Sequence, residues 1–98
     1  MATGTELFLD LLESEGIRYI FGNPGTTEVP IIDALAGREG LQYVLGLQES
    51  VVLAMADGYS RASGQLCAAS LHVTPGLGNA MGSLYGAHRF GSPVLVTA

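Results

Sequence analysis

Glu49 is the residue whose type and position could do chemistry in this chain. It stands in Leu45-Gly46-Leu47-Gln48-Glu49-Ser50, where an apolar run typical of a strand passes into a long apolar helix. Strand-to-helix junctions lie at the carboxyl edge of a parallel sheet, where open α/β folds bind their ligands. A carboxyl group among Leu47, Val51 and Val52 is expected to be desolvated, which favours its protonated form and suits it to exchange a proton. The alternative is structural, because the helix dipole favours an acid in the first turn.

Two histidines and one cysteine are the other side chains with reactive atoms. His72 follows an apolar run at the expected end of a strand, whereas His88 falls late in a helix, where the dipole favours a histidine. Taken alone, His72 is better explained as a histidine satisfied near the core. Cys67 stands in an apolar run and is predicted to be a small core residue rather than a nucleophile. A single cysteine also excludes a disulfide within the chain.

The composition excludes several classes of site. The 98 residues carry a formal net charge of −5 with no lysine, which argues against nucleic acid or an anionic membrane as a partner. Without lysine, no Walker phosphate loop and no Schiff-base site can form within these residues. No apolar run approaches the ~20 residues of a membrane span, and no basic region precedes an apolar stretch at the start. We therefore expect a cytoplasmic protein with one small domain.

Helices and strands are predicted to alternate along the chain. Apolar residues at helical spacing predict helices over 5–15, 28–36, 48–63 and 75–90, and short apolar runs predict strands over 17–21, 41–47, 66–73 and 94–98. Thr5 is the expected cap of the first helix, and Pro75 is expected to open the fourth. Alternation with short connections predicts an α/β fold with three layers, α/β/α, around a mainly parallel sheet.

Small residues recur four apart in two of the predicted helices. They are Ala54, Gly58 and Ala62 in one helix and Gly78, Gly82 and Gly86 in the other. Each interior glycine costs about 1 kcal/mol against alanine, so a stripe of them predicts another backbone packed close by. Tight packing inside the domain and a subunit interface would both supply that backbone.

The segment Gly76-Leu77-Gly78-Asn79-Ala80-Met81-Gly82 resembles a dinucleotide phosphate loop only poorly. Its third glycine comes one residue late, and no acidic residue follows at the usual distance. A nucleotide-binding α/β domain is therefore the weaker alternative for this segment.

Four linked segments carry a family resemblance that covers nearly all of the chain. They are FGNPGTTE at 21–28, GLQES at 46–50, ADGYSRA at 56–62 and LHVTPGLGNAMG at 71–82. In order and spacing they resemble the thiamine-diphosphate-dependent decarboxylases and acetolactate synthases. The chain looks like the amino-terminal pyrimidine-binding (PYR) domain of that superfamily, which has a flavodoxin-like fold. The first and last segments are most similar to benzoylformate decarboxylase.

The resemblance implies roles for particular residues. Glu49 matches the glutamate that hydrogen-bonds N1′ of the cofactor's aminopyrimidine and promotes its imino tautomer. His72 matches a histidine that exchanges protons with the reacting substrate, which reverses the preference for a core histidine. Thr26 takes the place of a serine that contacts the substrate. Further residues match positions that line the pyrimidine pocket, namely Pro24, Gly25, Thr74, Gly78 and Asn79.

The departures from the family pattern are as informative as the matches. In the family a separate carboxy-terminal domain holds the diphosphate and its Mg²⁺ through Gly-Asp-Gly and a later asparagine, a motif that this sequence lacks. We therefore expect residues 1–98 to be the amino-terminal part of a PYR domain, without the middle and diphosphate-binding domains and inactive by itself.

The implied function is a lyase acting on a small 2-oxo acid with thiamine diphosphate and Mg²⁺, in a homo-oligomer of two or four subunits. The alternatives are a fragment of an acetolactate-synthase-like carboligase and a non-catalytic dimerisation module.

Overall fold

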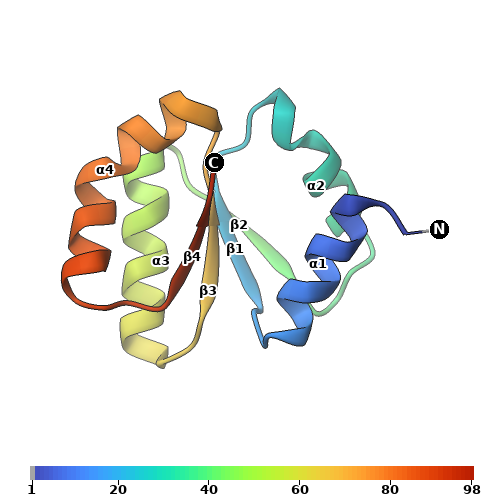
Figure 1. The fold of residues 1–98 in the computed structure, drawn as a ribbon, viewed down its shortest axis with the longest axis horizontal. Helices are drawn as coiled ribbons and strands as arrows, with labels where there is room; N and C mark the ends of the chain where they lie inside the picture. Colours follow the sequence, from blue (N-terminus) through green and yellow to red (C-terminus); the bar gives the residue numbers. More distant parts are fainter. Residues whose placement is uncertain (1) are drawn as a thin grey trace.

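The computed structural model describes residues 2–98 and shows one sheet between two layers of helices (Figure 1). The elements in chain order are α1 (Gly4–Ser14), β1 (Tyr19–Gly22), the short 3-10 helix η1 (Thr26–Glu28), α2 (Val29–Leu35), β2 (Gln42–Leu45), α3 (Glu49–Ser63), β3 (Cys67–Ser70), α4 (Val73–Arg89) and β4 (Val94–Thr97). The predicted three-layer α/β/α architecture is confirmed.

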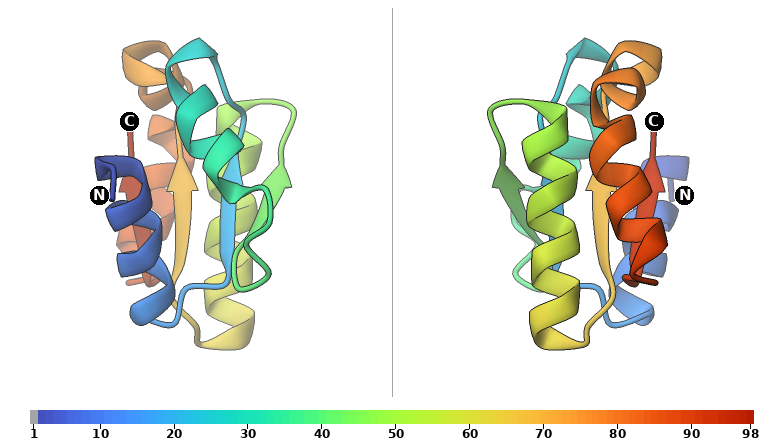
Figure 2. Two further views of the ribbon diagram at one scale, coloured as in Figure 1. Left: turned by 90° about the vertical axis from the view of Figure 1, so that its right-hand side faces the viewer. Right: turned by 90° about the vertical axis from the view of Figure 1, so that its left-hand side faces the viewer.

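The four strands are all parallel and lie in the order β2-β1-β3-β4. Helices α1 and α2 cover one face of the sheet, and α3 and α4 cover the other (Figures 1 and 2). The chain leaves β1 toward β2 by way of α2, then returns through α3 to place β3 on the opposite side of β1. This reversal makes the gap between the carboxyl ends of β1 and β3 a topological switch point, where open α/β sheets bind ligands.

Alternate side chains of the strands supply two cores, one on each face of the sheet. Phe21 and Ala69 face α3 and α4, whereas Ile20 and Ala68 face α1 and α2. Cys67 is fully buried in the first of these cores, as predicted, and burial raises the pKa of its thiol to about 11.

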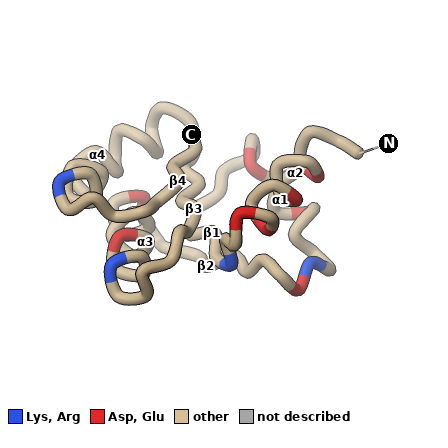
Figure 3. Tube along the Cα trace, turned by 60° about the horizontal axis from the view of Figure 1, so that its bottom comes forward, with Lys and Arg blue, Asp and Glu red and all other residues tan. Residues whose placement is uncertain are grey.

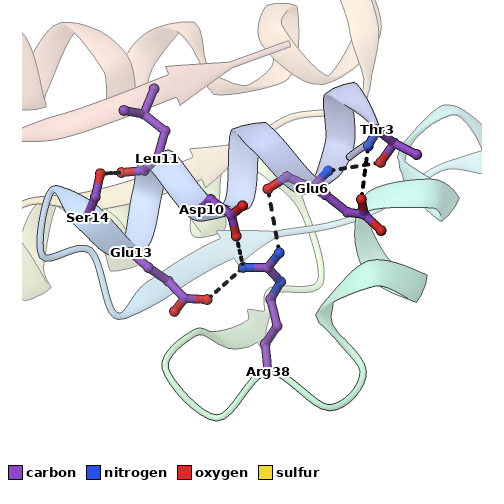
Figure 4. A network of polar contacts seen from close by, with 7 residues as sticks. All are labelled: Thr3, Glu6, Asp10, Leu11, Glu13, Ser14 and Arg38. Atoms are coloured by element: carbon purple, nitrogen blue, oxygen red, sulfur yellow. Dashed lines mark hydrogen bonds and ion pairs between the residues drawn. The ribbon is translucent and has the colours of Figure 1, made fainter. Parts of the chain in front are cut away.

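Two predicted helix starts are wrong. Helix α1 is capped by Thr3 rather than Thr5, because Glu6 lies three residues after Thr3 and closes a reciprocal capping box with it (Figure 4). Helix α4 begins at Val73 rather than Pro75, and β3 accordingly ends at Ser70. A proline fits anywhere in the first helical turn, since those N–H groups have no partner within the helix, so Pro75 did not fix the first residue.

Charged side chains are concentrated around α1 and α2. Of the nine acidic residues, only Glu49 and Asp57 follow residue 40, and Figure 3 shows the others around α1 and α2. Arg38 joins the loop after α2 to α1, with Nη1 2.8 Å from Asp10 and 2.9 Å from Glu13 (Figure 4). Among residues 2–98, no helix is long and apolar enough to span a membrane.

The glycine stripe of α4 faces away from the rest of the chain. A Cβ atom placed on Gly78, Gly82 or Gly86 would meet nothing within 4 Å beyond the neighbouring residues and backbone of its own helix, and the same holds for Gly58 of α3. Packing of these glycines against another backbone inside the domain, one of the two alternatives, is therefore contradicted within residues 2–98. A subunit interface stays a prediction.

Candidate functional site

Glu49 is the first residue of α3, directly beyond the carboxyl end of β2. Gly46 permits the sharp turn between the two elements, because a Cβ there would lie 2.6 Å from Cγ2 of Val52. Gln48 caps the helix by accepting the N–H of Ser50 at 2.6 Å. The local sequence thus holds the Glu49 backbone firmly at this edge of the sheet.

The Glu49 carboxylate meets the first turns of α4. Its Oε1 accepts a hydrogen bond from Nδ2 of Asn79 at 3.1 Å. Its Oε2 lies 3.3 Å from the point that a Cβ of Gly76 would occupy, so glycine at position 76 lets the carboxylate approach the α4 backbone. Two predicted site residues, Glu49 and Asn79, are therefore in direct contact, and Oε2 makes no hydrogen bond to residues 2–98.

The expected apolar surroundings of Glu49 are wrong in part. Val52 is fully buried, but Leu47 is 88% exposed and Val51 is 48% exposed. Leu47 belongs to the loop before the helix, and Val51 points outward from the first turn. Glu49 itself is half-buried within residues 2–98, and its full desolvation would need a further surface.

His72 lies between β3 and α4 and contacts the loop that follows β1. Its Nδ1 is 2.9 Å from Oε2 of Glu28 and 3.3 Å from Oγ1 of Thr27. The imidazole lies so close over Gly25 that a Cβ at that position would overlap the ring. The ends of β1 and β3 thus meet through these side chains at the switch point.

Glu28 is a buried acid whose position sequence reasoning missed, since it was interpreted only as a helix start. Only 8% of the residue is exposed, yet its carboxylate accepts hydrogen bonds from the Gly25 N–H at 2.7 Å and the Thr27 hydroxyl at 2.8 Å. Burial opposes ionisation, but these two donors and His72 outweigh it and hold the pKa of Glu28 below its ordinary value. The sequence did contain a signal for this role. Glu28 lies three residues after Gly25, which is the spacing of a capping box, and the strand order places its segment beside the end of β3.

The backbone after His72 is strained. Val73 has a φ of +44°, and it is the one non-glycine residue with positive φ among residues 2–98. A β-branched side chain rarely adopts this conformation, and such outliers concentrate at functional sites. The Val73 N–H donates to the carbonyl of Leu71 at 3.1 Å, which closes a tight turn around His72.

The remaining predicted residues are spread more loosely along the same edge. Thr26 is exposed and lines a separate hollow of about 510 Å³ with Pro24 and Gly25, and it is Thr27 that contacts His72. Thr74 and Gly78 are exposed in the first turns of α4. The structure therefore divides the site into a Glu49–Asn79 cluster and a His72–Glu28 cluster.

The polar atoms of the Glu49–Asn79 cluster bear on the thiamine cofactor that the family resemblance implies. A carboxyl group with one unengaged oxygen can donate to a ring nitrogen when it is protonated and accept a ring N–H when it is ionised, so the Glu49–Asn79 cluster fits an aminopyrimidine. Within residues 2–98, no group of three His, Cys, Asp or Glu side chains could hold a metal ion. The described residues thus fit the pyrimidine end of the cofactor and not its metal.

Comparison with known proteins identifies the family of the chain. The family described as "Thiamine pyrophosphate enzyme, N-terminal TPP binding domain" matches residues 2–98. The chain belongs to this family of thiamine diphosphate-dependent enzymes.

The similar proteins in this family include a decarboxylase and an acetolactate synthase. The chain is 40% identical to benzoylformate decarboxylase of Pseudomonas aeruginosa over 91% of its own length and 16% of the relative's. It is 31% identical to the acetolactate synthase large subunit of Haemophilus influenzae, over 96% of its length and 16% of the relative's.

The solved structure of a 4-hydroxybenzoylformate decarboxylase from Rhodococcus jostii RHA1 matches with a TM-score of 0.92 and 43% identity, over 99% of this chain and 18% of that one. The chain therefore spans less than a fifth of the length of these relatives.

Proposed function

We propose that this chain supplies the pyrimidine-binding portion of a thiamine-diphosphate-dependent 2-oxo-acid decarboxylase similar to benzoylformate decarboxylase. The observation that carries the proposal is that Glu49 and His72 both stand at the carboxyl edge of the sheet, each with a polar partner. The 40% identity to the Pseudomonas enzyme supports the same assignment. Residues 1–98 are then the amino-terminal part of a PYR domain.

In this proposal the Glu49 cluster binds the cofactor's pyrimidine ring. Oε2 of Glu49 would exchange a proton with the ring nitrogen, donating to it when protonated and accepting its N–H when ionised, and Asn79 orients the carboxyl group through its hydrogen bond to Oε1. The family resemblance also assigns Pro24, Gly25, Thr74, Gly78 and Asn79 to the lining of the pyrimidine pocket, although Pro24 and Gly25 lie with Thr26 along a separate hollow of this edge. When bound, thiamine diphosphate supplies a thiazolium ring that accepts the electron pair left behind when carbon dioxide departs.

The diphosphate and Mg²⁺ would be held by other parts of the complete protein. The chain has no lysine, and residues 2–98 contain no metal-binding cluster. Glu49 is only half-buried within residues 2–98, which is consistent with this, since a second domain or subunit would cover it.

His72 and Thr26 would serve the substrate rather than the cofactor. The His72 imidazole exchanges a proton with the 2-oxo acid substrate, and the Thr26 hydroxyl donates a hydrogen bond to the same substrate. Thr26 carries one methyl group more than the serine of the family pattern, so it narrows the space for the substrate. A small-molecule 2-oxo acid is the expected substrate class.

An acetolactate-synthase-like carboligase is the second candidate, favoured by the identity to the Haemophilus enzyme. Decarboxylation and carboligation begin with the same steps, so the choice between them rests on the products. Benzaldehyde from benzoylformate indicates the decarboxylase, and acetolactate from pyruvate indicates the carboligase.

The test begins with the source gene beyond codon 98, in the same frame. A frame that continues and encodes Gly-Asp-Gly with a later asparagine allows the complete protein to be assayed with thiamine diphosphate, Mg²⁺ and benzoylformate or pyruvate. Glu49→Gln is then expected to lower turnover roughly 10²- to 10⁴-fold, the usual contribution of a positioned acid or base. Glu39→Gln, at an exposed position, is the matched control and should leave turnover unchanged. A stop codon directly after codon 98, or unchanged turnover in Glu49→Gln, would refute the assignment.

A further inference from the structure

The contacts of Glu28 determine which nitrogen of His72 carries the proton. Ionised, the Glu28 carboxylate only accepts hydrogen bonds, so the 2.9 Å contact between its Oε2 and Nδ1 of His72 requires a hydrogen on Nδ1. The Gly25 N–H approaches the same Oε2 at 2.7 Å as a second donor. A ring with the proton on Nε2 instead would direct its Nδ1 lone pair at a carboxylate oxygen.

Thr27 leads independently to the same assignment. Its hydroxyl has one proton, and the 2.8 Å contact with Oε1 of Glu28 uses that proton, since a carboxylate cannot donate. At 3.3 Å from Nδ1 of His72, Oγ1 of Thr27 can therefore act only as an acceptor. Both neighbours of Nδ1 are acceptors, and both require Nδ1–H.

We propose that Glu28 is a positioning residue that fixes His72 as the Nδ1–H tautomer and leaves Nε2 as the atom that exchanges protons. No residue in the described range 2–98 hydrogen-bonds to Nε2, and a third of the His72 side chain is exposed. In the neutral ring Nε2 holds a lone pair, so it accepts a proton to give the imidazolium and returns that proton to restore the neutral ring, while Nδ1–H stays on Glu28.

Three further features hold this arrangement in place. Gly25 leaves room for the imidazole ring, and the tight turn with the strained Val73 sets the direction of the His72 side chain. The low pKa of Glu28 keeps the carboxylate ionised at neutral pH. The tautomer is independent of the proposed function, whereas the catalytic use of Nε2 rests on it.

The direct test is nitrogen NMR of the 98-residue chain with ¹⁵N-labelled histidine, at a pH where the rings are neutral. Two histidines give two sets of signals, and His72→Gln assigns them. His88 is the internal reference, because it is exposed and makes no side-chain hydrogen bond to any residue in 2–98. The expected result is a His72 ring protonated mainly at Nδ1. A His72 ring protonated mainly at Nε2 overturns the proposal without any variant of Glu28.

Glu28→Ala and Glu28→Gln test the cause. Either change should move the tautomer ratio of His72 toward that of His88, whereas the exposed control Glu39→Gln should not move it. Circular dichroism of each variant shows whether it has folded, and the spectrum of the unmodified chain decides the question if Glu28→Ala does not fold. An unchanged ratio in folded Glu28→Ala also overturns the proposal.

The kinetic test uses the complete enzyme. Glu28→Gln should lower kcat on the order of 10- to 100-fold with little change in KM, the cost that is typical when the carboxylate that orients a metal-binding histidine is removed. In a His72→Ala background the same change should cause no further loss, and a further loss of similar size would refute action through His72. If the complete enzyme decarboxylates no 2-oxo acid, the proposed function fails while the NMR result for Glu28 stands.

Discussion

Gly25→Ala is the substitution whose effect follows most directly from the structure. The backbone of Gly25 has a φ of −111°, which alanine adopts without strain, so any cost must come from the added methyl group. That methyl group would overlap the His72 imidazole, and the ring must move away from Glu28. The stability of Gly25→Ala therefore measures how strongly the contact with Glu28 holds the imidazole ring of His72.

The magnitude follows from what is lost and what is gained. A hydrogen bond to a charged group contributes about 1.5–3 kcal/mol to the free energy of unfolding. Replacing glycine by alanine at a compatible backbone position returns about 0.4–1 kcal/mol by restricting the unfolded chain. The net loss is about 1.5 kcal/mol, which at about 4–8 °C per kcal/mol lowers Tm by roughly 6–12 °C in a chain of this size.

Urea unfolding of the 98-residue chain, arranged as a double-mutant cycle with His72→Ala, is the assay. In the His72→Ala background, Gly25→Ala should leave the free energy of unfolding unchanged or raise it slightly. Gly82→Ala is the matched control, because Gly82 lies inside α4 with open space around it and alanine there should stabilise by about 1 kcal/mol. An equal cost of Gly25→Ala with and without the imidazole would refute the reasoning.

Three further expectations concern other parts of the chain. Val73→Gly should be more stable than Val73→Ala by about 1 kcal/mol, the reverse of the usual helix order, because the φ of +44° favours glycine; thermal melts of both variants check this. The hydrogen bonds that Asp57 accepts from Arg61 and Ser92 outweigh its burial and lower the pKa of its carboxyl group. The stability that they give is therefore present at neutral pH and is lost as pH falls below about 4, so Asp57→Asn should lower Tm at pH 7 much more than at pH 2. With a thiol pKa of about 11, Cys67 should react with a thiol reagent at pH 8 only as fast as the chain unfolds, and rapid labelling of the native chain would contradict its burial.

The sequence predicted the order and type of the elements well because most of them are set by local signals. Gly64 ends α3 in the left-handed conformation with φ +69°, as a glycine after the last apolar position predicts. The two wrong helix starts arose where several residues could fill one role, Thr3 or Thr5 as cap and Val73 or Pro75 as first residue. Local residue preferences then do not determine the first residue of the helix, which is set by the capping box in α1 and by the tertiary fold in α4.

The site could be predicted only in part, because its contacts join segments far apart in the chain. The contact between Glu49 and Asn79 spans thirty residues, and that between Glu28 and His72 spans 44. The family resemblance identified three of these four residues, Glu49, His72 and Asn79, because each stands in a segment that matches a family motif. Glu28 was missed because its importance comes from the residue opposite it, which only the strand order β2-β1-β3-β4 brings close.

The first turn of α4 connects the two clusters and contains the strained residue Val73. The carbonyl of His72 accepts the N–H of Gly76 at 2.8 Å, and Gly76 is the residue that the Glu49 carboxylate approaches. Within the five residues from His72 to Gly76, the chain therefore directs the imidazole toward the segment after β1 and places Gly76 against the Glu49 side chain of α3. Val73, the one non-glycine residue with positive φ among residues 2–98, lies between these two contacts, where backbone strain at a functional site is expected. Relieving that strain with Val73→Gly should thus stabilise the backbone while loosening the His72 ring, so a gain in Tm accompanied by a weaker Nδ1–H preference would show that the strain serves the site.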